Sequence, residues 1–198
     1  MSVELVRSPI VDVHDVEFTT HDEPPPISDD AAERAILGAT LMDPPRVIPK
    51  VEPLLGAADF HDPRHGVLWE VFVAIHARGD VLDIVTAVAE LRTRNRLNAI
   101  GGAQYLGELT DEIPTTVHCE AHARLVVEAS RRRRLGSIGE RLALAVRNPA
   151  HDPEKLRDAA VEALRALRFG RGATASSALD LVGDALASIE RGTKGEGK

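Results

Sequence analysis

Two pairs of histidines come closest to the spacing of a metal site. His61 and His65 lie four positions apart, as do His118 and His122, which flank Cys119. Residues four apart share one face of a helix, where two imidazoles could bind zinc. Two ligands do not complete a site, and the acid of an H-E-x-x-H motif is absent. We therefore expect surface or capping histidines, and no metal site.

Glycines and lysines gather at the end of the chain, in the stretch GTKGEGK. A phosphate-binding loop needs the spacing G-x-x-x-x-G-K-[ST] between a strand and a helix, and this stretch lacks both the spacing and the context. No Ser-His-Asp, Cys-His or paired-carboxylate pattern has persuasive spacing either. The sequence thus predicts no catalytic residue and no cofactor-binding residue in this chain.

One run of basic residues stands out, formed by Arg131, Arg132, Arg133 and Arg134. At 100° per residue, four consecutive side chains wrap around a helix and cannot all face one ligand. Glu128 can pair with Arg132 at i, i+4. A solvated or subunit-facing patch is the favoured interpretation, and contact with DNA or an acidic partner is the alternative.

Composition and charge restrict the class of protein. The chain has 198 residues, 3% aromatic residues and a net charge of −7. Residues 1–113 carry 9 basic and 20 acidic side chains, net −11, whereas residues 114–169 carry 11 and 7, net +4. An aliphatic core favours packed helices, and scarce aromatics argue against base stacking on single-stranded nucleic acid. With one cysteine, no signal peptide and no apolar stretch fit for a membrane, we expect a cytoplasmic protein.

The sequence predicts an all-α fold in four parts. Residues 1–27 form an acidic tail without sustained periodicity, for which disorder is the favoured interpretation. Residues 28–114 contain five helical patterns and form a compact helical domain. Their expected starts are Ser28 as an N-cap, Asp43-Pro44, Asp62-Pro63, Asp83, and the pair Gly101-Gly102. In the fourth pattern, the apolar positions Ile84, Val85, Val88 and Leu91 recur at helical spacing.

A helical hairpin and a linker follow. Residues 115–169 contain a long helix and a second helix that starts at Asp152-Pro153. The predicted interface of this hairpin consists of Leu135, Ile138, Leu142, Leu156 and Leu164. Residues 170–198 combine a flexible linker with an amphipathic linker helix. That helix is expected to dock on a groove through Leu179, Val182, Leu186 and Ile189.

Several stretches together resemble the N-terminal domain of the DnaB-type replicative DNA helicases. The main one is Asp83-Ile84-Val85-Thr86, Leu91, Leu97, Ile100-Gly101-Gly102, Tyr105-Leu106, Leu109 and Pro114-Thr115. Before it come Ala32-Glu33, Ile36-Leu37-Gly38, Asp43-Pro44, Asp59-Phe60-His61 and His65, and after it come Ala123, Val126-Val127 and Arg133-Arg134-Leu135. These matches cover about residues 26–135, and from 136 to 191 only the layout of hairpin, linker and short helix is similar.

The resemblance implies a function in DNA replication. In that family, hairpins pair into a collar on a hexameric ring, and the collar contacts primase. The linker helix docks on the motor domain of the neighbouring subunit. The resemblance therefore implies self-association through the hairpin, from dimer to hexamer, with a helicase motor domain or primase as partner. ATP and magnesium are expected only for the motor domain, which these 198 residues lack.

Two alternatives belong to other classes of protein. One is a stand-alone regulator that binds a helicase or primase in trans through the linker helix. The other is a DNA-binding module that uses the basic hairpin, whose affinity would depend steeply on salt.

Overall fold

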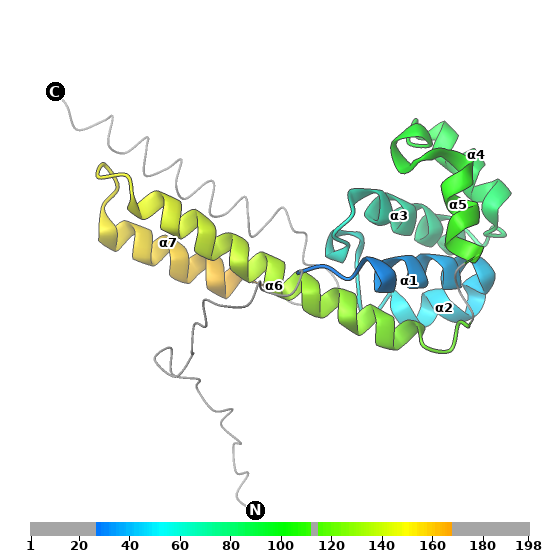
Figure 1. The fold of residues 1–198 in the computed structure, drawn as a ribbon, viewed down its shortest axis with the longest axis horizontal. Coiled ribbons are helices and arrows are strands. Elements are labelled where there is room, and N and C mark those ends of the chain that lie inside the picture. Colours follow the sequence, from blue (N-terminus) through cyan, green and yellow to red (C-terminus); the bar gives the residue numbers. More distant parts are fainter. Residues whose placement is uncertain (1–26, 112–114, 168–198) are drawn as a thin grey trace, which may run out of the picture.

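A head and a projecting hairpin make up the molecule, in a computed structural model that describes residues 27–111 and 115–167 (Figure 1). Within these ranges every regular element is helical, as predicted. The head contains α1 (Asp30–Met42), α2 (Pro44–Val51), η2 (Ala57–Asp59), α3 (Pro63–Ala77), α4 (Ile84–Thr93), η3 (Asn98–Ile100) and α5 (Gly102–Asp111). The hairpin is formed by α6 (Cys119–Val146) and α7 (Pro153–Ala166).

Aspartates start most of these helices. Asp62 and Asp152 each precede a proline at the first helical position, and each side chain accepts a backbone N–H two residues on. Asp83 accepts the N–H of Thr86 at 2.7 Å, and the Thr86 hydroxyl accepts the N–H of Asp83 in return, which closes a capping box. These starts confirm the sequence predictions.

The start of α1 differs from the prediction by one residue. Asp29, not Ser28, is its N-cap, and Asp29 Oδ1 accepts the N–H of Ala32 at 2.9 Å. Serine and aspartate cap helices about equally well, so side-chain type alone does not distinguish two adjacent candidates. The register of the buried face decides, because Ala32 and Ile36 must both point inward.

The core of the head is built around α1, which contacts α2, α3, α5 and α6. Ile36 and Leu37 of α1 are fully buried against the inner faces of the surrounding helices. Leu68 and Phe72 supply the face of α3, and Leu106 supplies that of α5. Of the four apolar positions at helical spacing in α4, Val85 lies on the outside and is 76% exposed. The inner face of α4 is centred on Ala87, Val88 and Leu91, and Val85 lies outside that arc.

The long helix α6 belongs to both parts of the molecule. Its first half carries Cys119, Ala123, Val126 and Val127, which are buried in the same core as α1. Its second half projects and pairs with α7 (Figure 1). The head therefore extends past the predicted division between residues 114 and 115. Despite its 28 residues, α6 is rich in charged side chains, and no described helix is both long and apolar enough to cross a membrane.

A glycine at the α3–η2 contact gives a stability prediction. A Cβ on Gly66 would lie 2.8 Å from the carbonyl oxygen of Ala57, which is backbone and cannot swing aside. We expect Gly66→Ala to lower the free energy of unfolding by about 1–3 kcal/mol, as overpacking does. Gly107 in α5 is the matched control, because no atom lies within 4 Å of the position that a Cβ would take there. Gly107→Ala should stabilise by up to about 1 kcal/mol through helix propensity.

Urea unfolding followed by circular dichroism compares the two variants. Equal changes in unfolding free energy for Gly66→Ala and Gly107→Ala would contradict a steric role for Gly66.

Candidate functional site

The four consecutive arginines of α6 separate into two pairs. Arg131 and Arg132 are exposed and pair with Glu128 at 3.9 and 3.2 Å. Arg133 is half-buried, and Arg134 is only 8% exposed. The helical period accounts for this division, because α6 turns one of its faces toward η2 at this point.

Arg133 and Arg134 join α6 to the head, together with Ser130 and Asp59. Asp59 Oδ1 accepts hydrogen bonds from Ser130 Oγ and from an Arg134 guanidinium nitrogen, each at 2.8 Å. Arg133 donates to the carbonyl oxygens of Asp59 and Ile27. We call Asp59, Ser130, Arg133 and Arg134 the α6 clasp. Asp59 Oδ2 also accepts the N–H of Gly56, so the position of the carboxylate is fixed within its own turn.

Burial governs the electrostatics of the clasp. It lowers the pKa of Arg133 below its ordinary value, although the charges of Glu33 and Asp59 act in the opposite direction. The ion pair between Arg134 and Asp59 is almost completely shielded from water, with side-chain exposures of 8% and 5%. As a predicted contact for DNA or a partner, Arg134 is therefore a correction. Arg131 and Arg132 remain accessible.

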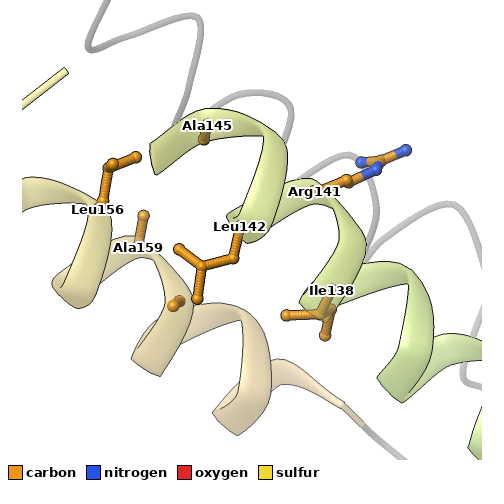
Figure 2. A pocket seen from close by; sticks show the side chains of 7 residues that line it. Ile138, Arg141, Leu142, Ala145, Leu156 and Ala159 are labelled. Atoms are coloured by element: carbon orange, nitrogen blue, oxygen red, sulfur yellow. The ribbon is translucent and has the colours of Figure 1, made fainter. Parts of the chain in front are cut away.

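The hairpin seam lies between α6 and α7. Figure 2 shows Ile138, Leu142 and Ala145 of α6 along the seam, with Leu156 and Ala159 on the facing helix. These residues enclose a small cavity of about 20 Å³, and the side chain of Arg141 extends away from it (Figure 2). Ile138 and Leu156 are each 4% exposed. Three predicted interface residues, Ile138, Leu142 and Leu156, are thus brought together inside one chain.

Leu135 and Leu164 are corrections to the predicted seam. They are 53% and 46% exposed, respectively. Because α6 and α7 are antiparallel, Leu135 lies beyond the end of α7, and the last described residue, Leu167, packs against Ile138. Leu164 lies about 100° around the helix from the buried Ala163, so it faces away from α6. The other large apolar side chains of the described hairpin that are exposed are Leu125, Leu144, Val146 and Val161.

A buried polar network in the head escaped the sequence analysis. His65 is fully buried and Glu33 is 1% exposed. His65 Nδ1 lies 2.6 Å from Glu33 Oε2, and its Nε2 lies 2.5 Å from the hydroxyl of Tyr105. The backbone N–H groups of His61 and Asp62 also donate to Glu33. An imidazole with a proton on Nδ1 donates to Glu33, and its Nε2 can then accept from the hydroxyl of Tyr105.

The network is closed to substrates and metals. Both ring nitrogens of His65 are engaged, so it offers no free ligand atom to Asp30 and Asp62, the two carboxylates that approach it. The expectation of a surface or capping role is wrong for His65, whereas His61 and His118 are exposed. The sequence did contain a signal, because His65 continues the inward-facing series of Leu68 and Phe72 at helical spacing.

Tyr105 provides a pH prediction. Burial raises the pKa of its phenol above the ordinary value of 10.0, against the opposing charges of Arg34 and Arg64. Arg64 lies over the ring, 4.8 Å from its centroid. A raised pKa means that the folded state holds the proton more tightly. Its contribution to stability is therefore complete below pH 10.0, the ordinary value, and is lost as pH rises through the folded pKa.

Ultraviolet absorbance of the phenolate measures this directly, because Tyr105 is the only tyrosine in the chain. We expect a midpoint above 10.0 for the native protein and a return to that value in denaturant. A native midpoint at or below the denatured one would contradict the assignment.

Known relatives now identify the chain. The described part defines an all-helical head with a projecting hairpin. The family model described as DnaB-like helicase N terminal domain matches residues 25–128, just over half of the chain. The chain belongs to this family, which confirms the resemblance seen in the sequence.

Two relatives from different organisms support the assignment. The replicative DNA helicase DnaB of Geobacillus stearothermophilus is 40% identical over 104 residues, which are 52% of this chain and 23% of the relative. That of Mycobacterium leprae is 35% identical over 117 residues, 59% of this chain and 19% of the relative. The chain thus spans less than a quarter of the length of these relatives.

Solved structures show the same fold. The crystal structure of the N-terminal domain of DnaB helicase from Mycobacterium tuberculosis is similar with a TM-score of 0.66 and 32% identity, covering 72% of this chain and 99% of that one. A second solved structure, whose description is the structure of a DnaB-like replicative helicase and its interactions with primase, has a TM-score of 0.57 and 23% identity. It covers 82% of this chain and 37% of that one, and supports the fold alone.

The predicted linker helix residues Leu179, Val182, Leu186 and Ile189 lie outside the described residues, as do residues 1–26 of the predicted tail.

Proposed function

We propose that this chain is the oligomerisation and partner-binding part of a DnaB-like replicative helicase, acting in the cytoplasm. The observation that carries the proposal is the apolar surface left uncovered on the hairpin. Leu135, Leu144 and Val146 of α6 are each more than half exposed. Exposed apolar side chains on a projecting element are typical of protein interfaces.

The surface of α6 beside these residues suits a second helix. Gly136 and Gly139 lie on the exposed side, and nothing within 4 Å would meet a Cβ at either position. Within the described chain, therefore, no other residue packs closely against these two glycines. Glycine weakens a helix by about 1 kcal/mol relative to alanine, so two of them in one helix favour a role outside the single chain. A hairpin from another copy would use that space.

Sedimentation equilibrium of the full chain tests self-association. The Leu135→Glu/Leu164→Glu variant buries two charges where two leucines would pack, and each leucine is worth about 1.5–3 kcal/mol on burial. We expect the dissociation constant to rise at least about a hundredfold. Val85→Glu is the matched control, since Val85 is equally apolar and 76% exposed, but belongs to the head.

Two results would contradict the hairpin interface. One is a strict monomer at high concentration for the unaltered chain. The other is an equal weakening by Val85→Glu and by the hairpin variant.

Partner binding is proposed for the helicase motor domain and for primase, because one similar structure is described as a DnaB-like replicative helicase and its interactions with primase. ATP and magnesium would then serve a motor domain outside these residues. Purified chain is expected to show no ATP turnover, with or without DNA, in a coupled assay. DNA-stimulated turnover would contradict this division of labour.

DNA binding by the hairpin has weaker support, because the α6 clasp engages Arg133 and Arg134 and leaves only half of the arginine run accessible.

A further inference from the structure

A groove on the head combines an apolar lining with negative charge. It has a volume of about 300 Å³, the lower limit for ligand sites, and lies between α3 and the turn that joins α2 to η2. Leu55 and Trp69 line it and are almost completely buried, and Val73 is half-buried along it. The two charged residues of its lining are Glu52 and Glu70, and no basic side chain of the described chain lines it.

Small residues supply the rest of the groove. Gly56 and Ala57 line it from the turn before α3, and Ala74 lines it from α3. Such residues allow the backbone of a bound segment to approach closely. The N–H of Gly56 donates to Asp59 Oδ2 at 2.8 Å, and the other oxygen of that carboxylate accepts from Arg134. An occupant of the groove would therefore contact the turn that positions the α6 clasp.

The charge of the head restricts the kind of occupant. Residues 27–111 carry 13 acidic and 8 basic side chains, so the groove lies on a surface of net negative charge. Such a surface attracts and orients cationic partners. Lysine and arginine join a cationic end to an apolar stem, and Glu70 and Val73 are one turn apart on the same face of α3. The stem of a basic side chain can thus lie along Val73 while its charge reaches Glu70.

We propose that this groove docks a segment of a partner protein in which a lysine or arginine lies next to a large aliphatic residue. The cationic end pairs with Glu52 and Glu70, and the aliphatic side chain packs against Val73 and Ala74. The inference rests on the partner-binding half of the proposed function, and it names a surface on the head and the kind of sequence that this surface takes. The surface is separate from the hairpin residues proposed for self-association.

Trp69 reports on occupancy, because it is the only tryptophan of the chain and lines the groove. The probe is the synthetic peptide Gly-Lys-Leu-Lys-Leu-Gly, acetylated and amidated at its ends and added to the full chain. We expect a saturable change in Trp69 fluorescence, together with NMR shifts of the amides of Gly56, Ala57 and Ala74. Added salt should weaken binding, because it screens exposed ion pairs. The peptide Gly-Glu-Leu-Glu-Leu-Gly is the control and should produce neither change.

Changes in the groove test the chemistry of docking. Glu52→Gln/Glu70→Gln should weaken binding of the lysine peptide about five- to tenfold, because it removes two exposed ion pairs. Glu108→Gln/Glu140→Gln is the matched control, since it removes the same charge from two exposed glutamates outside the groove and should leave the affinity unchanged. Ala74→Leu fills the groove and should weaken binding at least about tenfold. Circular dichroism should show an intact fold in every variant.

The Leu135→Glu/Leu164→Glu variant separates this proposal from self-association. It should bind the lysine peptide as tightly as the unaltered chain does, although its own association is weakened. Peptide binding by a chain that does not associate would contradict the hairpin interface alone. Association without peptide binding would overturn the groove alone.

Other results would also overturn the docking site. They are an equal response to the glutamate peptide, an affinity that Ala74→Leu or Glu52→Gln/Glu70→Gln leaves unchanged, and an equal loss in the Glu108→Gln/Glu140→Gln control. The same amide shifts in concentrated protein without peptide would assign the groove to a second copy. Binding of n-butylammonium as tight as that of the peptide would assign it to a small cation.

Discussion

Glu33→Ala is expected to lower the free energy of unfolding by about 3–5 kcal/mol. The Glu33 carboxylate accepts hydrogen bonds from the backbone of His61 and Asp62, and it lies 2.6 Å from His65 Nδ1. Alanine leaves all three donors without this acceptor, and the His65 ring among them is completely shielded from water. Because a domain is stable by about 5–15 kcal/mol in total, the variant should lie close to its unfolding threshold.

Urea unfolding followed by the fluorescence of Trp69, the only tryptophan, measures this loss. Glu33→Gln keeps the shape and one carbonyl acceptor and should fall between wild type and alanine. Glu108→Ala is the matched control on the exposed side of α5, where only an i, i+4 contact with Gln104 is lost. It should change stability by less than about 0.5 kcal/mol. A loss below about 1 kcal/mol for Glu33→Ala would show that the network does not support the head.

Asp59→Ala is expected to cost a comparable amount, about 3–5 kcal/mol, for a different reason. It leaves the guanidinium of Arg134, 8% exposed, without its carboxylate. It also removes the acceptor of Ser130 Oγ and of the Gly56 N–H. The Asp59→Ala/Arg134→Met variant should recover at least about 2 kcal/mol. Two apolar side chains can be buried there at little cost, whereas a buried guanidinium without its carboxylate is strongly destabilising.

Unfolding free energies of the two single variants and the double variant form a thermodynamic cycle that isolates the pair. Arg165 and Glu162 serve as the control pair, since both side chains are 73% exposed. Their double alanine variant should change stability by less than about 1 kcal/mol. If Asp59→Ala and Arg134→Met contribute additively, then the two side chains do not act as a buried pair.

Local chemistry made most helix boundaries predictable from sequence. An aspartate followed by proline fixes a start within two residues, as Asp62 and Asp152 show. The α4 capping box between Asp83 and Thr86 is likewise local. Such features depend only on neighbouring residues in the chain, so they can be predicted without knowing how the helices pack.

The site depended on packing and was mostly beyond prediction. Glu33 and Tyr105 lie 32 and 40 residues from His65, and only the packing of α1, α3 and α5 brings them together. Arg134 illustrates the same limit, because its partner Asp59 is 75 residues away. Leu135 has the spacing of a seam residue, yet the facing helix ends before reaching it. Spacing indicates which residues share a face, and it does not indicate where the opposing surface stops.

The continuity of α6 has a mechanical consequence. From Arg134 in the clasp to Val146 at the tip, the helix extends by 12 residues, or about 18 Å. No hinge separates its two halves, so it acts as a lever with its fulcrum at the clasp. A tilt of about 10° at that fulcrum would displace the tip by about 3 Å, more than half the pitch of the helix. Small changes in how the head holds Arg133 and Arg134 would therefore become large changes in the position of the hairpin tip.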